Sequence, residues 1–152
     1  MRSLAALVLL LGIALCAVAQ KATVPTGERS PAETLRFDGT WDATVACPDV
    51  WEAGQRAKGY TLRFSVEVRD GVLHGQHGSA NAPSWLLLEG HIRADGAADI
   101  AARGLTGDPD YSVGQVVRST PYGYSVKAQF SETGGSGQRM EGRECELSFA
   151  KR

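Results

Sequence analysis

The sequence predicts an all-β fold, an antiparallel up-and-down meander of about eight strands that closes, fully or nearly, into a small barrel. Three observations favour this fold. After Phe37, several segments alternate apolar and polar residues with a period of two, as strands with one buried face do. Glycine-containing turns separate these segments, and two of them are Asp-Gly pairs typical of tight hairpins. No stretch has a convincing helical period. A sandwich of two sheets is the alternative architecture.

Residues 1–19 have the pattern of a secretory signal peptide. Arg2 supplies a positive charge, and residues 4–15 form an apolar run that is too short for a comfortable membrane span. The Ala-Val-Ala that ends at Ala19 offers the small residues that a signal peptidase requires, so we expect cleavage after Ala19. The alternatives are lipidation at Cys16, which the bulky residue before it disfavours, and a retained membrane anchor.

The rest of the chain divides into a leader and one domain. Residues 20–36 contain two prolines and several polar residues without any period, which predicts a flexible leader. Residues 37–152 are long enough to form a single β-barrel domain with its own core. Loss of Arg2 with the signal reduces the 16 basic residues to 15, against 17 acidic residues. This balance gives no electrostatic footprint for nucleic acid or for an anionic membrane.

Eight segments have the alternation of a strand and follow one another through short loops. The clearest is 59–71, in which Tyr60, Leu62 and Phe64 face one way and the polar residues between them face the other. Segments 97–105 and 111–119 have weaker patterns. The predicted strands, in chain order, are 39–47, 59–71, 72–79, 84–96, 97–105, 111–119, 120–132 and 138–152.

Two places in this series need a local departure from regular strands. In the last segment, Met140 has the opposite parity to Cys145 and the apolar residues after it, which a bulge near Arg143 and Glu144 would reconcile. In the loop after the first strand, Asp49 could cap one helical turn.

Cys47 and Cys145 remain after removal of the signal, and a cysteine pair in an exported protein usually forms a disulfide. If the first and last strands pair antiparallel, both cysteines face the interior and can bridge directly. The pairing closes the barrel and sets apolar residues opposite one another along its interior. The implied pairs are Val45 with Leu147, Ala43 with Phe149, and Trp41 with Lys151.

Two histidines in the third predicted strand raise the question of a metal site. His74 and His77 are an odd number of residues apart, so they point to opposite faces and cannot share one metal ion. We expect His74 outside, in an exposed charge row with Glu67, Glu89 and Arg103 in which Glu89 lies opposite Arg103. His77 is expected inside near one rim, where it either bonds a backbone carbonyl or is a polar handle at a pocket.

An exposed transition-metal site is the alternative interpretation of the outer row. His74, Glu89 and His91 would share that face, and two imidazoles with a carboxylate are plausible ligands. Nothing in the sequence supplies dry surroundings for such a site. We therefore expect no bound metal and no cofactor.

The loops predict which end of the barrel carries function. Alternate loops of a meander lie at opposite ends, and binding residues gather on long loops of a rigid scaffold. The short loops are 70–71, 95–96 and 119–121, and the longer ones are 48–59, 78–83, 104–111 and 132–138. Trp51 is the most suggestive residue, as a contact site or as a plug over the barrel mouth. The candidate binding residues at this end are Trp51, Tyr60, His77, Trp85, Asp108, Asp110 and Tyr111.

Two resemblances accompany these patterns. The segments FDGTW, GYTLRF, VRDGVLHGQHG, GLTGDPDYSVG and TPYGYSVKAQF resemble an uncharacterised family of small exported domains of Gram-negative bacteria. This resemblance implies a periplasmic, single exported domain and transfers no site residues. More distantly, Gly39 and Trp41 resemble the Gly-x-Trp start of lipocalin- and avidin-like barrels. In lipocalins that Trp closes the barrel base beneath a basic residue of the last strand, which implies this role for Lys151 or Arg152.

The favoured function is an exported, non-enzymatic binding module that takes a small apolar or amphipathic ligand at the long-loop end. The alternative is a protein-interaction or protease-inhibitor-like envelope domain, whose filled barrel is a platform for Trp51. Ser79, His77 and Asp108 could be imagined as a hydrolytic trio, but no nucleophile elbow or other motif supports an enzyme. We expect a periplasmic or secreted protein without a stable membrane span after signal cleavage. Its partner would be a small ligand or an envelope protein.

The signal and the disulfide are tested together by the mass of the protein purified from the periplasm. We expect the chain to start at Gln20 and to be about 2 Da lighter than the reduced chain, because one disulfide removes two hydrogens. Intact mass spectrometry before and after reduction measures both quantities. A lipid adduct, or a chain that retains Arg2, would contradict the cleavage predicted here.

Overall fold

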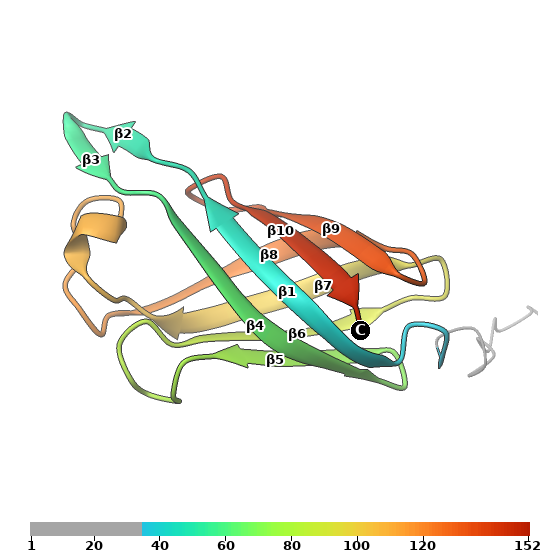
Figure 1. Cartoon of the computed structure of the whole chain (residues 1–152). Helices are drawn as coiled ribbons and strands as arrows, with labels where there is room; N and C mark the ends of the chain where they lie inside the picture. The colour runs from blue at the N-terminus through green and yellow to red at the C-terminus, as the bar shows by residue number, and fades with distance from the viewer. Residues whose placement is uncertain (1–34) are drawn as a thin grey trace, which may run out of the picture.

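A computed structural model describes residues 35–152, which form a closed eight-stranded antiparallel barrel with a two-stranded hairpin at one end (Figure 1). The predicted all-β barrel is confirmed, and the two-sheet alternative is wrong. The predicted signal and nearly all of the leader lie outside the described residues. The elements are β1 (Gly39–Cys47), β2 (Val50–Glu52), β3 (Gln55–Ala57), β4 (Tyr60–Arg69), β5 (Val72–His77), β6 (Leu86–Ile92), β7 (Ala97–Leu105), η1 (Pro109–Tyr111), β8 (Pro121–Phe130), β9 (Gly134–Arg139) and β10 (Glu146–Lys151).

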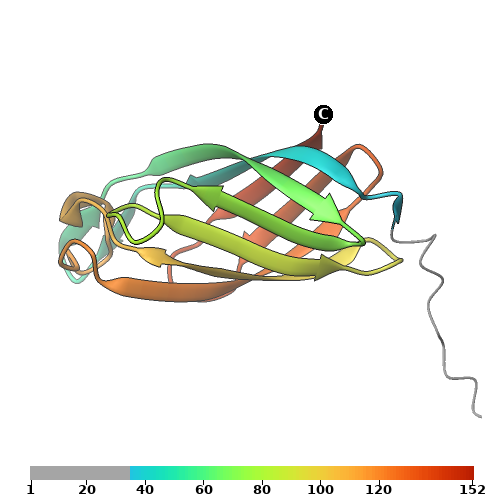
Figure 2. The same ribbon diagram turned by 90° about the horizontal axis from the view of Figure 1, so that it is seen from below.

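The barrel closes through β1 and β10 in the predicted register. Trp41 pairs with Lys151, Ala43 with Phe149, and Val45 with Leu147, so every interior pair but the first is apolar. Cys47 and Cys145 form a disulfide across a sequence separation of 98 residues. Figures 1 and 2 show the start of β1 and the C-terminus at one end of the barrel, and the β2–β3 hairpin and η1 at the other. No helix within residues 35–152 has the length and apolar character needed to cross a membrane.

One predicted strand is absent from the barrel, and an unpredicted strand takes its place. Residues 111–119 form a loop after η1, because Gly114 and Gln115 both adopt positive φ angles (71° and 49°) that a strand does not accommodate. The unpredicted strand is β9, most of which lies in the stretch 132–138 that the sequence predicts as a loop.

The inward positions of β9 are Gly135, Gly137 and Arg139, so the strand has no alternating apolar pattern. A Cβ atom at Gly137 would lie 2.9 Å from the Ala128 Cβ, and one at Gly135 would lie 2.9 Å from the Phe130 ring. Side chains of β8 therefore fill the space that β9 leaves empty. Met140 follows the end of β9 and is exposed, so the predicted bulge near Arg143 and Glu144 is a loop between two strands.

The loop after β1 also differs from its prediction. Residues 50–57 form the β2–β3 hairpin, in which Trp51 pairs with Arg56, in place of a helical turn. Ala53 and Gly54 turn the hairpin with positive φ angles. The Asp49 carboxylate bonds Arg56 and the Gly59 backbone N–H, so it joins the two ends of the hairpin.

The outer face of the barrel carries the predicted charge row with one change of register. His74 lies opposite Glu67 and Glu89 and is exposed, as predicted. Glu89 lies opposite Ala101, and Arg103 reaches the Glu89 carboxylate diagonally at 2.7 Å. The register differs by two residues because the three-residue turn spans 94–96, with Gly96 at its last position at φ 84°.

The end of the barrel that holds the start of β1 and the C-terminus is filled, and we call it the base. Trp41 is 0% exposed, and its ring lies 5.4 Å from the Phe130 ring, which lies 4.8 Å from the Phe149 ring. The Trp41 indole donates to the Phe37 carbonyl at 2.9 Å, and the Lys151 ammonium lies 5.6 Å from the Trp41 ring centroid. Trp41 and Lys151 therefore have the basal arrangement that the lipocalin resemblance implies.

Removal of the disulfide should lower the stability of the fold. The double substitution Cys47→Ala, Cys145→Ala is expected to reduce the free energy of unfolding by about 4 kcal/mol, because a bridged loop of this length restricts the unfolded chain. Urea denaturation monitored by tryptophan fluorescence measures the change. Reduction of the wild-type protein should reproduce the loss, and the same reductant should leave the variant unchanged. A loss below about 1 kcal/mol would contradict the prediction.

Candidate functional site

The end opposite the base carries the long connections, and we call it the mouth. Four segments meet there: 48–59 with the β2–β3 hairpin, 78–85, 106–120 with η1, and 140–145. The tight connections 70–71, 93–96 and 131–133 lie at the base. The sequence predicts these two ends correctly in general, but it exchanges two loops. Residues 119–121 belong to the mouth, and 132–138 belong to the basal turn and β9.

Backbone hydrogen bonds hold the mouth segments to one another. The Lys58 N–H donates to the Asp110 carbonyl at 2.8 Å, and the Lys58 ammonium bonds the Asp110 carboxylate at 2.5 Å. Thr106 and Thr120 lie at the two ends of the long loop 106–120, where the Thr106 N–H donates to the Thr120 carbonyl at 3.0 Å. The hairpin, η1 and the long loop therefore form one connected rim.

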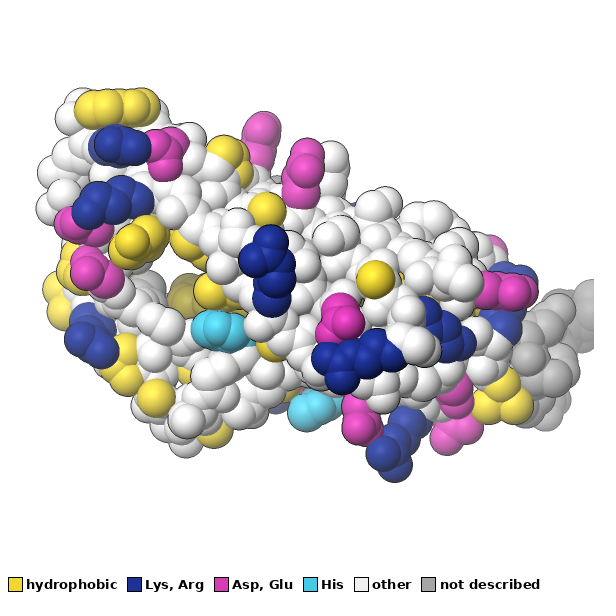
Figure 3. Space-filling view, viewed as in Figure 1, with side chains coloured by type: hydrophobic (Ala, Val, Ile, Leu, Met, Phe, Trp, Pro, Cys, Tyr) yellow, Lys and Arg dark blue, Asp and Glu magenta, His cyan; other side chains and the backbone are white. Residues whose placement is uncertain are grey.

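The rim encloses an open pocket of about 970 Å³. Figure 3 shows the hollow at this end of the molecule, with hydrophobic side chains visible inside it. Tyr60, Leu62 and Tyr122 of the barrel wall line it and are only partly buried, in contrast to the residues at the base. The lining residues from the loops include Pro48, Asp49, Val50, Leu105, Thr106, Asp108, Tyr111, Ser112, Val113, Val116 and Arg143.

Three of the candidate residues from the sequence line this pocket, namely Tyr60, Asp108 and Tyr111. Trp51 is 71% exposed on the hairpin, so it neither plugs the mouth nor lines the pocket. Asp110 faces Lys58 on the rim.

The last two candidates lie outside the pocket lining, His77 at the end of β5 and Trp85 in the mouth segment 78–85 just before β6. His77 points inward as predicted, with its ring 5.8 Å from the Phe64 ring and its Nδ1 atom 3.3 Å from the Ser84 carbonyl oxygen. The Trp85 indole nitrogen is buried and has no hydrogen-bond partner among the described residues.

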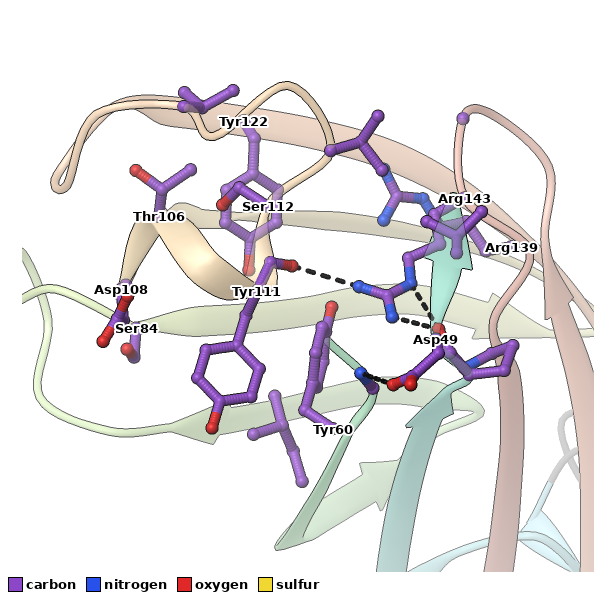
Figure 4. Close-up of a pocket in the computed structure, with 18 of the residues that line it drawn as sticks. Asp49, Tyr60, Ser84, Thr106, Asp108, Tyr111, Ser112, Tyr122, Arg139 and Arg143 are labelled. Atoms are coloured by element: carbon purple, nitrogen blue, oxygen red, sulfur yellow. Dashed lines mark hydrogen bonds between the residues drawn. The ribbon is translucent and has the colours of Figure 1, made fainter. Parts of the chain in front are cut away.

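Arg143 is the structural centre of the mouth. It is 7% exposed, and its guanidinium donates to the carbonyl oxygens of Pro48 at 2.9 Å, Tyr111 at 3.0 Å and Lys58 at 2.8 Å (Figure 4). Its central carbon lies 5.3 Å from the Tyr60 ring centroid. Within residues 35–152 it forms no ion pair with a carboxylate. One side chain from the β9–β10 loop thus joins both ends of the hairpin to η1.

Arg139 occupies the last position of β9, beside the pocket. Its Nε donates to the Glu141 carbonyl at 2.6 Å, and its central carbon lies 4.1 Å from the centroid of the Tyr124 ring. Burial lowers the pKa of the Arg143 guanidinium, and the positive charge of Arg139 also lowers it.

Three tyrosines surround these arginines. Burial raises the pKa of Tyr60, Tyr122 and Tyr124, to about 12 for Tyr122, and the charge of Arg139 opposes the rise in each case. The Tyr122 and Tyr124 rings stack with centroids 6.1 Å apart. Because all three phenols remain protonated at neutral pH, they present hydrogen-bond donors near Arg139.

Four acidic residues line the pocket, namely Asp49, Glu52, Asp108 and Glu144, and two of them have structural partners. A hydrogen bond from Arg56, followed by one from the Gly59 N–H, lowers the pKa of Asp49. The Asp108 carboxylate accepts from the Asp110 N–H at 3.0 Å and so caps η1. Asp108, His77 and Ser79, the imagined hydrolytic trio, form no hydrogen bonds to one another among the described residues. The described residues also contain no group of three or more His, Cys, Asp or Glu side chains that could hold a metal ion.

Comparison of the chain with protein-family models, with curated proteins and with solved structures found no match. The assignment of the site therefore depends on its own geometry.

The sequence interpretation missed Arg139, Arg143 and Tyr122 as mouth residues. Tyr122 was assigned to a strand next to a tight turn, although that turn belongs to the long loop of the mouth. Arg139 shares odd parity with Gly135 and Gly137, so recognition of β9 as a strand would have placed it inside the barrel. Arg143 has no signal in the sequence, because its partners are backbone carbonyls of distant segments.

The role of Arg143 is tested by substitution with methionine. We expect Arg143→Met to lower the free energy of unfolding by about 2–4 kcal/mol, since several carbonyl oxygens lose their donor in partly buried surroundings. Urea denaturation measures the loss. Relative to the wild-type protein, hydrogen exchange in the variant should become faster in 48–59 and 106–120, more than it does in the base. Arg103→Met removes an equal charge from the exposed outer face and serves as the control, with a smaller loss. Equal losses in both variants would contradict the assigned role.

Proposed function

We propose that this chain is an exported, non-enzymatic binding module that takes a small apolar or amphipathic ligand at the mouth of its barrel. The observation that carries the proposal is the difference between the two ends. Trp41, Phe130 and Phe149 fill the base, whereas the mouth holds an open pocket of about 970 Å³. Small-molecule sites are concave and mostly apolar, with a few convergent polar groups, and small barrels hold one such ligand.

The pocket has the mixed lining that an amphipathic ligand requires. Leu62, Leu105, Val113 and Val116 contribute apolar surface, and Tyr60 contributes an aromatic face with a polar tip. An exported location is supported by the disulfide together with the expected signal peptide.

A protein-interaction or protease-inhibitor-like role is the second candidate, and one observation favours it. Trp51 is 71% exposed on the hairpin and Val117 is 74% exposed on the long loop. Large apolar side chains in such positions often mark a contact surface. This role needs no pocket, so the two candidates respond differently to substitutions inside and outside the pocket.

Uptake of the neutral fluorophore N-phenyl-1-naphthylamine by the mature, disulfide-bonded protein tests the binding proposal. We expect saturable fluorescence enhancement, because transfer of the probe to an apolar pocket shields it from water. Leu62→Trp, which fills the pocket, should weaken binding at least about tenfold, and Trp51→Ala should change it less than about twofold. Near-ultraviolet circular dichroism confirms that each variant is folded.

Failure of the folded wild-type protein to take up the probe, or equal effects of Leu62→Trp and Trp51→Ala, would contradict a pocket ligand. Capture of a partner protein that is lost with Trp51→Ala and retained with Leu62→Trp would favour the second candidate.

A further inference from the structure

The inner wall of the mouth carries the charged side chain of Arg139, which forms no ion pair with a carboxylate within residues 35–152. The inward positions of β9 are Gly135, Gly137 and Arg139, because their partners on β8 are Phe130, Ala128 and Val126, which face the core. Lys151 shares the inward side at the base, where it lies over Trp41. The other basic residues of the barrel strands alternate outward and are exposed, and they are Arg63, Arg69, Arg103 and Lys127.

Arg139 has room to bind a further group. Its Nε bonds the Glu141 carbonyl, and the structure shows no other hydrogen bond and no ion pair from its guanidinium to residues 35–152. By contrast, the Arg143 guanidinium bonds the carbonyls of Pro48, Lys58 and Tyr111. A guanidinium has five N–H donors in a planar fork, so Arg139 retains several donors for a ligand.

The positions of the two arginines make an anion favourable in the pocket. Figure 4 shows the guanidinium groups of Arg139 and Arg143 on one side of the pocket, with Asp108 and Ser84 on the other. Both arginines line the cavity, and the two positive charges repel each other in partly buried surroundings. A negative group between or beside them offsets this repulsion.

The tyrosine hydroxyl groups add neutral donors at the same place. Tyr60 and Tyr122 line the pocket, and their hydroxyl groups have no hydrogen-bond partner among the described residues. In Figure 4 the Tyr60 hydroxyl points toward the arginine side of the pocket. Phenol donors next to a guanidinium match the acceptor oxygens of a carboxylate or a phosphate.

We propose that the ligand of this pocket is an amphipathic anion, whose carboxylate or phosphate oxygens bind Arg139 with the Tyr60 and Tyr122 hydroxyl groups and whose apolar body contacts Leu62 and Leu105. This inference rests on the proposed function, because it assigns the chemistry of the ligand in the same pocket. The pocket lining also contains the carboxylates of Asp49, Glu52, Asp108 and Glu144. Asp49 is bonded to Arg56 and Asp108 caps η1, and a cationic ligand on the arginine side of the pocket would meet two guanidinium groups.

Displacement of bound N-phenyl-1-naphthylamine by matched ten-carbon competitors tests the inference. The probes are decanoate, decyl phosphate, decanol and decyltrimethylammonium, at concentrations below micelle formation. We expect decanoate or decyl phosphate to bind at least about tenfold more tightly than decanol, and decyltrimethylammonium to bind most weakly. The ratio of the two anions distinguishes a carboxylate from a phosphate ligand. The preference for the anion should decrease as salt concentration rises.

Three variants connect the preference to named side chains. Arg139→Met keeps most of the side-chain length without its charge, and should weaken the better anion about tenfold with less than about a twofold effect on decanol. Tyr122→Phe removes one hydroxyl donor and should weaken the anion by a smaller factor. Arg103→Met removes an equal charge from the outer face and should leave all four competitors unchanged.

The outcomes separate this inference from the proposed function. If the fluorophore binds but decanoate, decyl phosphate and decanol compete equally, or Arg139→Met leaves the anions unaffected, the binding module stands and the anion assignment is wrong. If neither the fluorophore nor any competitor binds the folded protein, the proposed function itself is wrong. Loss of anion preference in Arg139→Met with retained decanol binding supports both.

Discussion

The antiparallel pairing of β1 with β10 is the constraint on which the rest of the structure depends. It removes the two edges that an open eight-stranded sheet would expose to other chains. It also fixes both ends of the barrel at once, because the register that joins Trp41 to Lys151 at the base brings Cys47 beside Cys145 at the mouth. Arg143 lies in the β9–β10 loop, which begins and ends on strands held by this closure. The position of Arg143 at the mouth therefore depends on the β1–β10 pairing.

Inside the closed sheet, side-chain size along β8 and β9 decides which end is solid. The inward glycines of β9 leave space near the base, and the Phe130 ring fills it against Trp41 and Phe149. An aromatic ring that covers a glycine on the neighbouring strand also protects that backbone from water. The next inward residue of β9 after Gly137 is Arg139, whose guanidinium lies over the Tyr124 ring and lines the open pocket.

The sequence predicts those parts of the molecule that period and covalent chemistry determine. Alternation in β1, β4 and β8 identified the core face, and the cysteine pair selected one closing register out of many. The hydrophobic period does not identify β9, since its inward Gly135 and Gly137 carry no apolar side chain. The strand predicted over 111–119 is absent, because Gly114 and Gln115 break the extended backbone there. Of the residues predicted at the long-loop end, Tyr60, Asp108 and Tyr111 line the pocket. The pocket arginines were not predicted, because their partners are carbonyls and rings brought together only by the closed fold.

Arg139 and Arg143 line the same pocket but differ in how far the fold satisfies their guanidinium groups. A guanidinium taken from water must recover its hydrogen bonds, and Arg143 does so with carbonyls of the hairpin and η1, which makes it part of the scaffold. Arg139 recovers one carbonyl bond and a ring face and is only partly buried beside the open pocket, so its remaining N–H groups are accessible. In the proposed binding mode, an anionic oxygen at these groups forms charge-assisted hydrogen bonds in surroundings of lower dielectric constant than bulk solvent. Arg143 would then hold the rim in place, and Arg139 would select the ligand.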